Sequence, residues 1–237
     1  MLKDIHFPGK VTGRKLDAYL ASGWYRIGQI IFTTDYIPHP EGWKRVFWLR
    51  FALDKFQFGQ KQLKLMAANN RFEFSIKPLE LTDELDELYY KYYHHLDFAA
   101  SPSLQNNLFD YSIIADPDHR VYDSQLLEIR DGGQLIAAGI FDKGEKTIAG
   151  ILNFFDPDYR KYSLGKWLML MKVQYALEND MTFYYPGYIA HDYPKFDYKI
   201  FPCREAAEIY DPVNKEWLLY SADLLRELKD TLPEPEA

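Results

Sequence analysis

The chain is poor in the residues that build covalent and metal-based sites. It contains one cysteine, Cys203, in 237 residues. An intrachain disulfide needs two cysteines, and the common zinc and iron–sulfur sites need several thiolates, so one chain cannot form these sites. The six histidines are dispersed and show no spacing typical of a metal site. We therefore expect no metal centre, and a reducing, cytoplasmic compartment.

Long apolar runs and an excess of positive charge are also missing. No stretch approaches the ~18 consecutive apolar residues of a membrane-spanning helix, and the N-terminus lacks the apolar core of a secretory signal, so no membrane partner is expected. With 35 Asp and Glu against 28 Lys and Arg, the formal net charge is -7. This balance disfavours coating of nucleic acid through bulk electrostatics, although it allows a local basic patch.

Apolar and aromatic residues are abundant. Hydrophobic residues make up 47% of the chain and aromatic residues 17%, including 19 tyrosines. This composition predicts a globular, sheet-containing protein and argues against disorder. The length suits one large domain or two small ones. The predicted division separates an N-terminal α/β region, residues 1–78, from residues 79–237, and the two regions are free to pack as one globular unit.

A strand, a charged turn and a helix form the stretch most suited to a site. Residues 126–130, 135–141 and 147–155 predict three antiparallel strands joined by glycine-containing turns. A helix follows, and Ser163 is expected to cap its first amides through its hydroxyl. The spacing of five residues places them on one buried helix face: Leu164, Trp167, Leu168, Met171 and Tyr175.

The start of this helix is a candidate anion site. Its first amides have no partner within the helix, and Arg160, Lys161 and Lys166 add positive charge around them. Lys166 lies in the first turn, where its charge opposes the helix dipole unless an anion offsets it. The alternative is a solvated basic turn, and the residues alone leave both interpretations open.

A tyrosine-rich strand is predicted after the helix. Tyr184, Tyr185 and Tyr188 offer stacking surfaces and hydroxyls, but they alternate between the two sides of a strand, so at most some can line a site. Pro186 and Gly187 within this strand are expected to interrupt its ladder and splay it.

Two further features flank these elements. The loop with Lys195, Tyr198 and Lys199 has the composition to meet phosphate or an acidic side chain, and equally that of an exposed basic loop. Asp156 has the chemistry to anchor an ammonium group or take its proton. The simpler interpretation of Asp156 followed by Pro157 is an Asx-type turn.

Three separated motifs resemble a known family. They read FDPDYRKYSLGKW (155–167), FYYPGYI (183–189) and YPKFDYK (193–199). A fourth stretch near the N-terminus, YLASGWYRIGQIIF (19–32), adds to the resemblance. In this order they resemble arginyl-tRNA–protein transferases and their bacterial leucyl-transferring relatives. The resemblance implies an α+β, GNAT-like (acyl-CoA N-acyltransferase-like) fold, in which helices flank a mixed sheet.

The resemblance also implies an activity. The expected enzyme is an aminoacyltransferase that moves an amino acid of the Arg or Leu type from charged tRNA to the N-terminal amine of an acceptor protein, as a degradation signal. Charged tRNA and acceptor N-termini are the expected partners, with aminoacyl-tRNA as co-substrate and no cofactor. The candidate catalytic residues are Asp156, Tyr185, Gly187 and Tyr188. The candidate tRNA- and substrate-binding residues are Arg160, Lys161, Ser163, Leu164, Gly165, Lys166, Lys195, Tyr198 and Lys199.

The chain departs from the family pattern in three places. The family's N-terminal cysteine cluster is absent, since residues 34–45 read TDYIPHPEGWKR. Its metal or redox regulation therefore cannot be carried over. The family's arginine-containing segment appears as GQKQLKLMAANN (59–70), and Phe196 replaces a methionine. These losses bear on tRNA affinity and amino-acid identity more than on the fold.

Two other functions remain open. An acyl-CoA-dependent N-acyltransferase of the same superfamily needs several small residues in its pyrophosphate loop, whereas DPDYRKYSLGK supplies only Gly165, so this function ranks second. A binding module that kept the fold and lost catalysis is the third, motivated by the missing arginines and the acidic composition.

Overall fold

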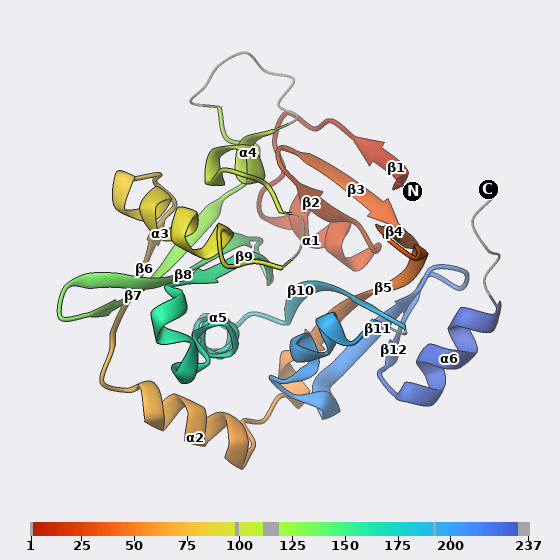
Figure 1. Ribbon diagram of the computed structural model, residues 1–237. Helices are drawn as coiled ribbons and strands as arrows, with labels where there is room; N and C mark the ends of the chain where they lie inside the picture. The colour runs from red at the N-terminus through yellow and green to blue at the C-terminus, as the bar shows by residue number, and fades with distance from the viewer. Residues whose placement is uncertain (1, 98–99, 111–118, 192, 232–237) are drawn as a thin grey trace.

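A large mixed sheet forms the centre of the computed structural model, which describes residues 2–97, 100–110, 119–191 and 193–231. The sheet has the strand order β12-β11-β5-β10-β9-β8-β7-β6, with β4 paired to β5, and a second sheet has the order β1-β3-β2 (Figure 1). The strands are β1 (Leu2–His6), β2 (Tyr25–Ile27), β3 (Ile30–Thr34), β4 (Tyr36–His39), β5 (Gly42–Ala52), β6 (Glu73–Pro78), β7 (Ser124–Asp131), β8 (Gln134–Lys143), β9 (Thr147–Phe155), β10 (Phe183–Ala190), β11 (Ala207–Asp211) and β12 (Glu216–Leu219).

Helices cover both faces of this sheet. The α-helices are α1 (Arg14–Ala21), α2 (Gln60–Asn69), α3 (Asp83–Tyr93), α4 (Leu104–Phe109), α5 (Leu164–Glu178) and α6 (Ala222–Thr231), and the 3-10 helices are η1 (Leu53–Lys55), η2 (Pro157–Tyr162), η3 (Pro194–Ile200) and η4 (Arg204–Ala206). Helices α2 and α5 lie on one side of β8 and β9, and α3 lies on the other (Figure 1). The predicted fold class, an α+β mixed sheet flanked by helices, is confirmed. No helix in the described ranges is long and apolar enough to cross a membrane.

The central strands are buried on both faces. Leu127 and Ile129 of β7 pack in the core that contains α5, whereas Leu126 packs with Leu85 and Leu88 of α3. Neighbouring residues of a strand point to opposite faces, so each face of β7 serves a separate cluster. This explains why the three-strand meander carries nearly continuous apolar runs.

Helix α5 is buried around most of its circumference. Four residues of the predicted face are buried, namely Leu164, Trp167, Leu168 and Met171, and Tyr175 is half-buried. The prediction of one buried face is incomplete, because five more side chains are also buried: Met169, Leu170, Lys172, Val173 and Ala176. Helix α2 contacts α5 on the side away from the sheet (Figure 1), which accounts for part of this burial.

The small sheet is joined to the large one by a buried ion pair. Arg26 of β2 lies 2.7 Å from the Asp142 Oδ1 atom of β8, and both side chains are almost completely buried. The same guanidinium donates hydrogen bonds to the carbonyls of Gly28 and Leu108 and to the Ser124 hydroxyl. Burial raises the pKa of Asp142, and the Arg26 charge opposes that rise.

The predicted division at residue 78 remains a prediction. Strand β5, from the first predicted region, lies between β10 and β11 of the second region, and β6 forms an edge of the same sheet. The large sheet is therefore built from both regions.

Candidate functional site

Strands β9 and β10 run side by side and then separate. They pair in parallel only where residues 147–149 face residues 183–185. Both strands are irregular at this level: the β8–β9 register shifts around Ile151, and the β10–β5 register shifts between Tyr184 and Gly187. A bulge bends its strand, so two bulges at one level direct the strands apart. The predicted interruption at Pro186 and Gly187 is confirmed.

A tyrosine from the small sheet lies at the point of separation. The Tyr25 hydroxyl is 2.6 Å from the Gly150 carbonyl oxygen of β9 and 2.9 Å from the Tyr185 carbonyl oxygen of β10. It thus bridges the two strands where their parallel pairing ends, and its one proton is shared between two carbonyl oxygens. Burial raises the pKa of Tyr25, which keeps this hydroxyl a donor.

A cavity of about 1080 Å³ opens beside the separated halves of the two strands. Its walls come from β9 and β10, the start of α5, η3, and the β4–β5 hairpin. The cavity brings together eight of the predicted site residues: Arg160, Ser163, Gly165, Lys166, Tyr188, Lys195, Tyr198 and Lys199. Residues from three separate motifs of the sequence therefore meet in one space.

Five predicted site residues do not line this cavity: Asp156, Lys161, Leu164, Tyr185 and Gly187. Leu164 is a fully buried core residue. Tyr185 points to the opposite side of β10, where its ring packs edge-on against Trp217 at 5.5 Å. The exposed Lys161 lies over the Tyr162 ring, 5.0 Å from its centroid.

Asp156 takes the simpler of its two predicted roles. Its Oδ1 atom accepts a hydrogen bond from the Asp158 amide at 3.1 Å, which is an Asx-type turn at the start of η2. Its Oδ2 atom lies 3.3 Å from Lys91 Nζ of α3, and the carboxylate is buried. This carboxylate is occupied by structural contacts outside the cavity.

The entrance of α5 differs from the prediction. Ser163 has a left-handed backbone (φ 53) and makes no side-chain cap, so the predicted hydroxyl cap is wrong. Its carbonyl instead accepts hydrogen bonds from the amides of Lys166 and Trp167, at 3.0 and 3.1 Å. A left-handed residue reverses the chain direction sharply, which joins η2 to α5 without a spacer. Arg160, Ser163 and Lys166 face the cavity from this junction.

Lys199 lies in a cage of aromatic and backbone groups. Its ammonium donates a 2.8 Å hydrogen bond to the Tyr188 carbonyl and lies 4.7 and 4.8 Å from the ring centroids of Tyr188 and Phe196. Burial lowers the pKa of Lys199 to about 7. A Cβ atom at Gly187 would lie 3.2 Å from this Nζ, so the glycine leaves the room that Lys199 occupies.

Lys172 and its partner Asn153 also line the cavity, and neither was predicted from the sequence. Lys172 is buried on α5, and its Nζ donates to the carbonyls of Ile140 and Leu152 and to Asn153 Oδ1, at 2.8, 3.2 and 2.8 Å. Burial lowers the pKa of Lys172 to about 7, whereas three oxygen acceptors favour the ammonium form. A lysine within the apolar run LMLMKV was the available signal, because such residues are rarely buried without a partner.

The cavity is cationic and otherwise largely apolar and aromatic. Five basic residues line it, namely Arg160, Lys166, Lys172, Lys195 and Lys199, and among the described lining residues the acidic member is Asp97. Such a lining suits anionic groups and flat or apolar surfaces. Within the described ranges, no cluster of three or more His, Cys, Asp and Glu side chains could hold a metal ion.

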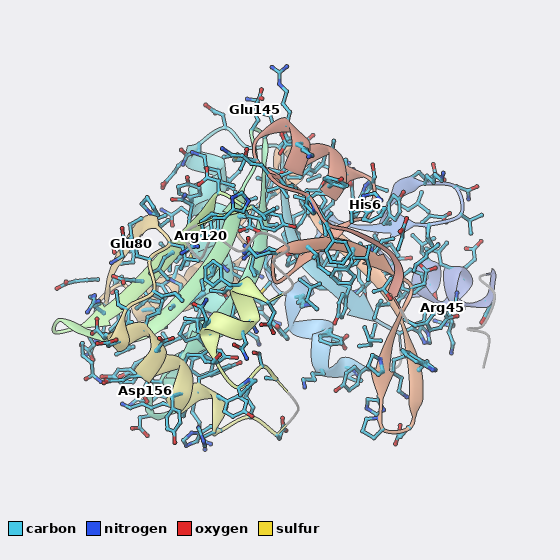
Figure 2. The ribbon with its side chains drawn as sticks, turned by 90° about the horizontal axis from the view of Figure 1, so that it is seen from above. His6, Arg45, Glu80, Arg120, Glu145 and Asp156 are labelled. Carbon is cyan, nitrogen blue, oxygen red and sulfur yellow. The ribbon has the colours of Figure 1, made fainter. Side chains whose placement is uncertain are left out.

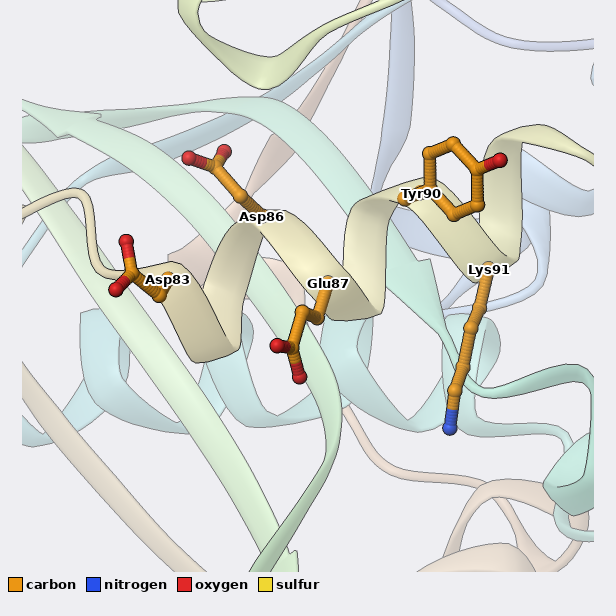
Figure 3. A pocket seen from close by; sticks show the side chains of 5 residues that line it. All are labelled: Asp83, Asp86, Glu87, Tyr90 and Lys91. Carbon is orange, nitrogen blue, oxygen red and sulfur yellow. The ribbon is translucent and has the colours of Figure 1, made fainter.

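A second hollow, of about 650 Å³, lies on the exposed face of α3 (Figure 3). It is lined by Asp83, Asp86, Glu87, Tyr90 and Lys91. Three of these five side chains are carboxylates, which repel phosphate. This hollow is therefore a poor candidate for binding an anion, and the cavity beside β9 and β10 is the candidate site.

Comparisons with known proteins give a consistent result. A family model described as "Arginine-tRNA-protein transferase, C terminus" matches residues 84–201. An aspartate/glutamate leucyltransferase from Leptospira interrogans is 26% identical over 219 residues, covering 89% of this chain and 79% of the relative. Arginyl-tRNA–protein transferase 1 from Arabidopsis thaliana is 27% identical over 184 residues, covering 70% of this chain and 28% of that protein.

Similar solved structures share less with the chain. L-PGS from Bacillus licheniformis aligns at 15% identity with a TM-score of 0.45, over 78% of this chain and 52% of that chain. A GCN5-related glucosamine N-acetyltransferase region of a fungal multi-domain beta-N-acetylglucosaminidase aligns at 13% identity with a TM-score of 0.42, over 83% and 22%. The chain spans about half or less of each of these solved chains.

Proposed function

The chain belongs to the arginine-tRNA–protein transferase family, and from this premise we propose that it moves an amino acid from charged tRNA to the N-terminal amine of an acceptor protein. The cavity between the separated β9 and β10 carries the proposal. It joins a basic helix entrance, which suits the phosphates of an acceptor end, to an aromatic interior. Aminoacyl-tRNA is the co-substrate, and the reaction as proposed uses no cofactor.

Transfer of the aminoacyl group depends more on positioning the two substrates than on reactive side chains of the protein. The neutral acceptor amine attacks the carbonyl carbon of the aminoacyl ester, a C–N bond forms, and the C–O bond to the terminal ribose breaks. The proton lost by the amine ends on the ribose oxygen, so the step balances without a further reactant. A bound 3′ end, an oriented amine and donors for the developing oxyanion are sufficient.

The lining favours leucine over arginine as the transferred residue. An arginyl side chain entering this cavity would lie among five basic residues. Among the lining residues that the structure describes, Asp97 is the acidic one, so the arginyl charge would be poorly compensated. A leucyl side chain carries no charge, so placing it among apolar and aromatic groups costs no desolvation free energy. The bacterial relative is named an aspartate/glutamate leucyltransferase. Lys195 at the cavity, together with Lys199 in its protonated form, would receive such an acidic N-terminal residue.

A panel of donors tests this proposal. Purified protein is incubated with each charged tRNA and with reporter peptides that begin with Asp or Ala, and the peptide masses are measured. We expect the Asp peptide to gain one leucine residue and to gain arginine at least ten times more slowly. Uncharged tRNA is the control. An unmodified peptide with every charged tRNA, together with consumption of acetyl-CoA, would instead identify an acyl-CoA-dependent enzyme.

The basic helix entrance predicts how tRNA binding depends on salt. Changing Arg160, Lys161 and Lys166 together to glutamine should weaken tRNA binding and reduce the slope of log affinity against log salt by about 1–3, because each lost phosphate contact contributes about 0.7–0.9. Affinities measured between 50 and 200 mM salt, roughly the range in which such contacts dominate, check this expectation.

The matched control for that experiment removes equal charge elsewhere. Lys10, Lys15 and Lys146 are exposed and do not line the cavity. Their combined change to glutamine should leave the salt slope close to that of the wild type. Equal slopes for the two triple variants would remove the phosphate-binding role of the helix entrance.

A further inference from the structure

Asn153 is held at the cavity by an unusual partner. It lies on β9 two residues beyond the bulge at Ile151, where β9 has already parted from β10. Its Oδ1 atom accepts a 2.8 Å hydrogen bond from Lys172 Nζ, and both residues line the cavity. Because an amide can accept a hydrogen bond only through its oxygen, this contact fixes which side of the group faces away from Lys172.

The nitrogen of this amide is available for a ligand. Asn153 Nδ2 has no hydrogen-bond partner among the residues that the structure describes, and it is not one of their buried unpartnered atoms. Asn153 itself is half-buried. An amide nitrogen offers N–H donors and no acceptor. It therefore suits an oxygen of the substrate and not the ammonium group of an acceptor.

The surrounding structure makes this orientation rigid. Lys172 is anchored at the same time by the carbonyls of Ile140 and Leu152, so its ammonium cannot follow a moving side chain. Gly139 on β8 allows the pair to fit, because a Cβ atom there would lie 3.0 Å from both Asn153 Oδ1 and Lys172 Cε. Burying a lysine costs free energy. Here the ammonium is compensated by three hydrogen bonds, two to carbonyls beside the strand bulge and one to the Asn153 amide.

We propose that Asn153 Nδ2 donates a hydrogen bond to the carbonyl oxygen of the aminoacyl ester as this oxygen becomes an oxyanion, and that Lys172 is the positioning residue that aims it. This inference rests on the proposed transfer function and names its oxyanion donor. When the amine attacks, the carbonyl electron pair moves to this oxygen. When the C–O bond to the ribose breaks, the pair returns to re-form the carbonyl. A donor fixed before the reaction stabilises the oxyanion without a cost of reorientation.

The test uses Asn153→Asp, which keeps the shape and can still accept from Lys172 but loses both N–H donors. We expect kcat for transfer to fall by about 10²–10³-fold, the usual effect of losing one oxyanion donor. KM for charged tRNA and the affinity for uncharged tRNA should remain within a few fold of the wild type. The control is Gln174→Ala on α5, the helix that carries Lys172, because the Gln174 side chain donates a hydrogen bond to Glu178 on the exposed surface.

A double-mutant cycle tests the positioning role of Lys172. Lys172→Met should lower kcat by about tenfold alone, and should cause no further loss in the Asn153→Ala background, because it acts through Asn153. Additive losses in kcat would indicate a structural role and overturn this part. Unchanged kcat in Asn153→Asp, with an active wild type, would overturn the inference and keep the transfer function. A wild type that transfers no amino acid would overturn both.

Discussion

Replacing Arg26 by methionine is expected to lower the free energy of unfolding by about 3–5 kcal/mol, the cost of removing one partner from a buried ion pair. The side chains of Arg26 and Asp142 are 2% and 0% exposed, and the variant would leave the carboxylate without its cation. Because burial already raises the pKa of Asp142, the variant should relieve part of the cost by taking up a proton. Its stability deficit should therefore shrink as the pH falls through the pKa of Asp142 in the folded state.

Urea unfolding at pH 8 and pH 5 measures this effect. The matched control is Arg14→Met, which breaks an Arg14–Glu145 pair with the same 2.7 Å N–O separation but with side chains 87% and 44% exposed. Glu145 lies at the periphery of the molecule in Figure 2. Exposed pairs contribute little, so this variant should unfold at nearly the wild-type urea concentration. A double variant, Arg26→Met with Asp142→Leu, should recover part of the lost stability. Equal deficits for Arg26→Met and Arg14→Met would contradict the burial argument.

Replacing Gly187 by valine is expected to slow amino-acid transfer by about 10²-fold. Gly187 has φ 98, which a β-branched residue adopts only with strain of roughly 1–3 kcal/mol. The added side chain would also displace Lys199 Nζ, because this atom lies 3.2 Å from the position of the new Cβ atom. A displacement of about 1 Å at a reacting centre costs about 10²-fold in rate. The measurement is the transfer rate at saturating charged tRNA.

Gly133→Val separates the two effects at Gly187. Gly133 has a similar φ of 87 but lies in the β7–β8 turn, and a Cβ atom there would meet nothing within 4 Å. The Gly133→Val variant should lose about as much free energy of unfolding as Gly187→Val, but its transfer rate should remain that of the wild type. If both valine variants lose the same fraction of activity, the loss at Gly187 reflects destabilisation alone, and the role assigned to the space around Lys199 is wrong.

Local signals in the sequence predicted the strands and the helix that form the site, but they did not predict which way every side chain points. The strain of Pro186 and Gly187 within a strand is a local property, and the interruption appears where it was predicted. The choice between Tyr185 and Tyr188 depends on which face of β10 meets the cavity, and strand alternation alone leaves that face open. The Ser163 cap failed because the turn before it requires a left-handed residue, which the pattern Ser-Leu-Gly does not reveal.

The remaining features depend on contacts between distant segments. Tyr25 bridges β9 and β10 from 125 and 160 residues away in the sequence. The Lys172–Asn153 contact joins α5 to β9 through a gap left by Gly139 on β8. Helical periodicity marked the apolar faces of α5, but it assigns no role to a lysine among them. Such pairs become visible only once the sheet and the helix are packed together.

Single-turnover transfer from leucyl-tRNA tests the central claim most directly. Excess protein is mixed with tRNA carrying radiolabelled leucine and with a peptide that begins with Asp, and the label is followed in tRNA, peptide and free leucine. We predict that label leaves the tRNA at the rate at which it enters the peptide N-terminus, with little free leucine formed. Release of the label as free leucine, or its retention on tRNA, would contradict the assignment of this cavity as an aminoacyl-transfer site.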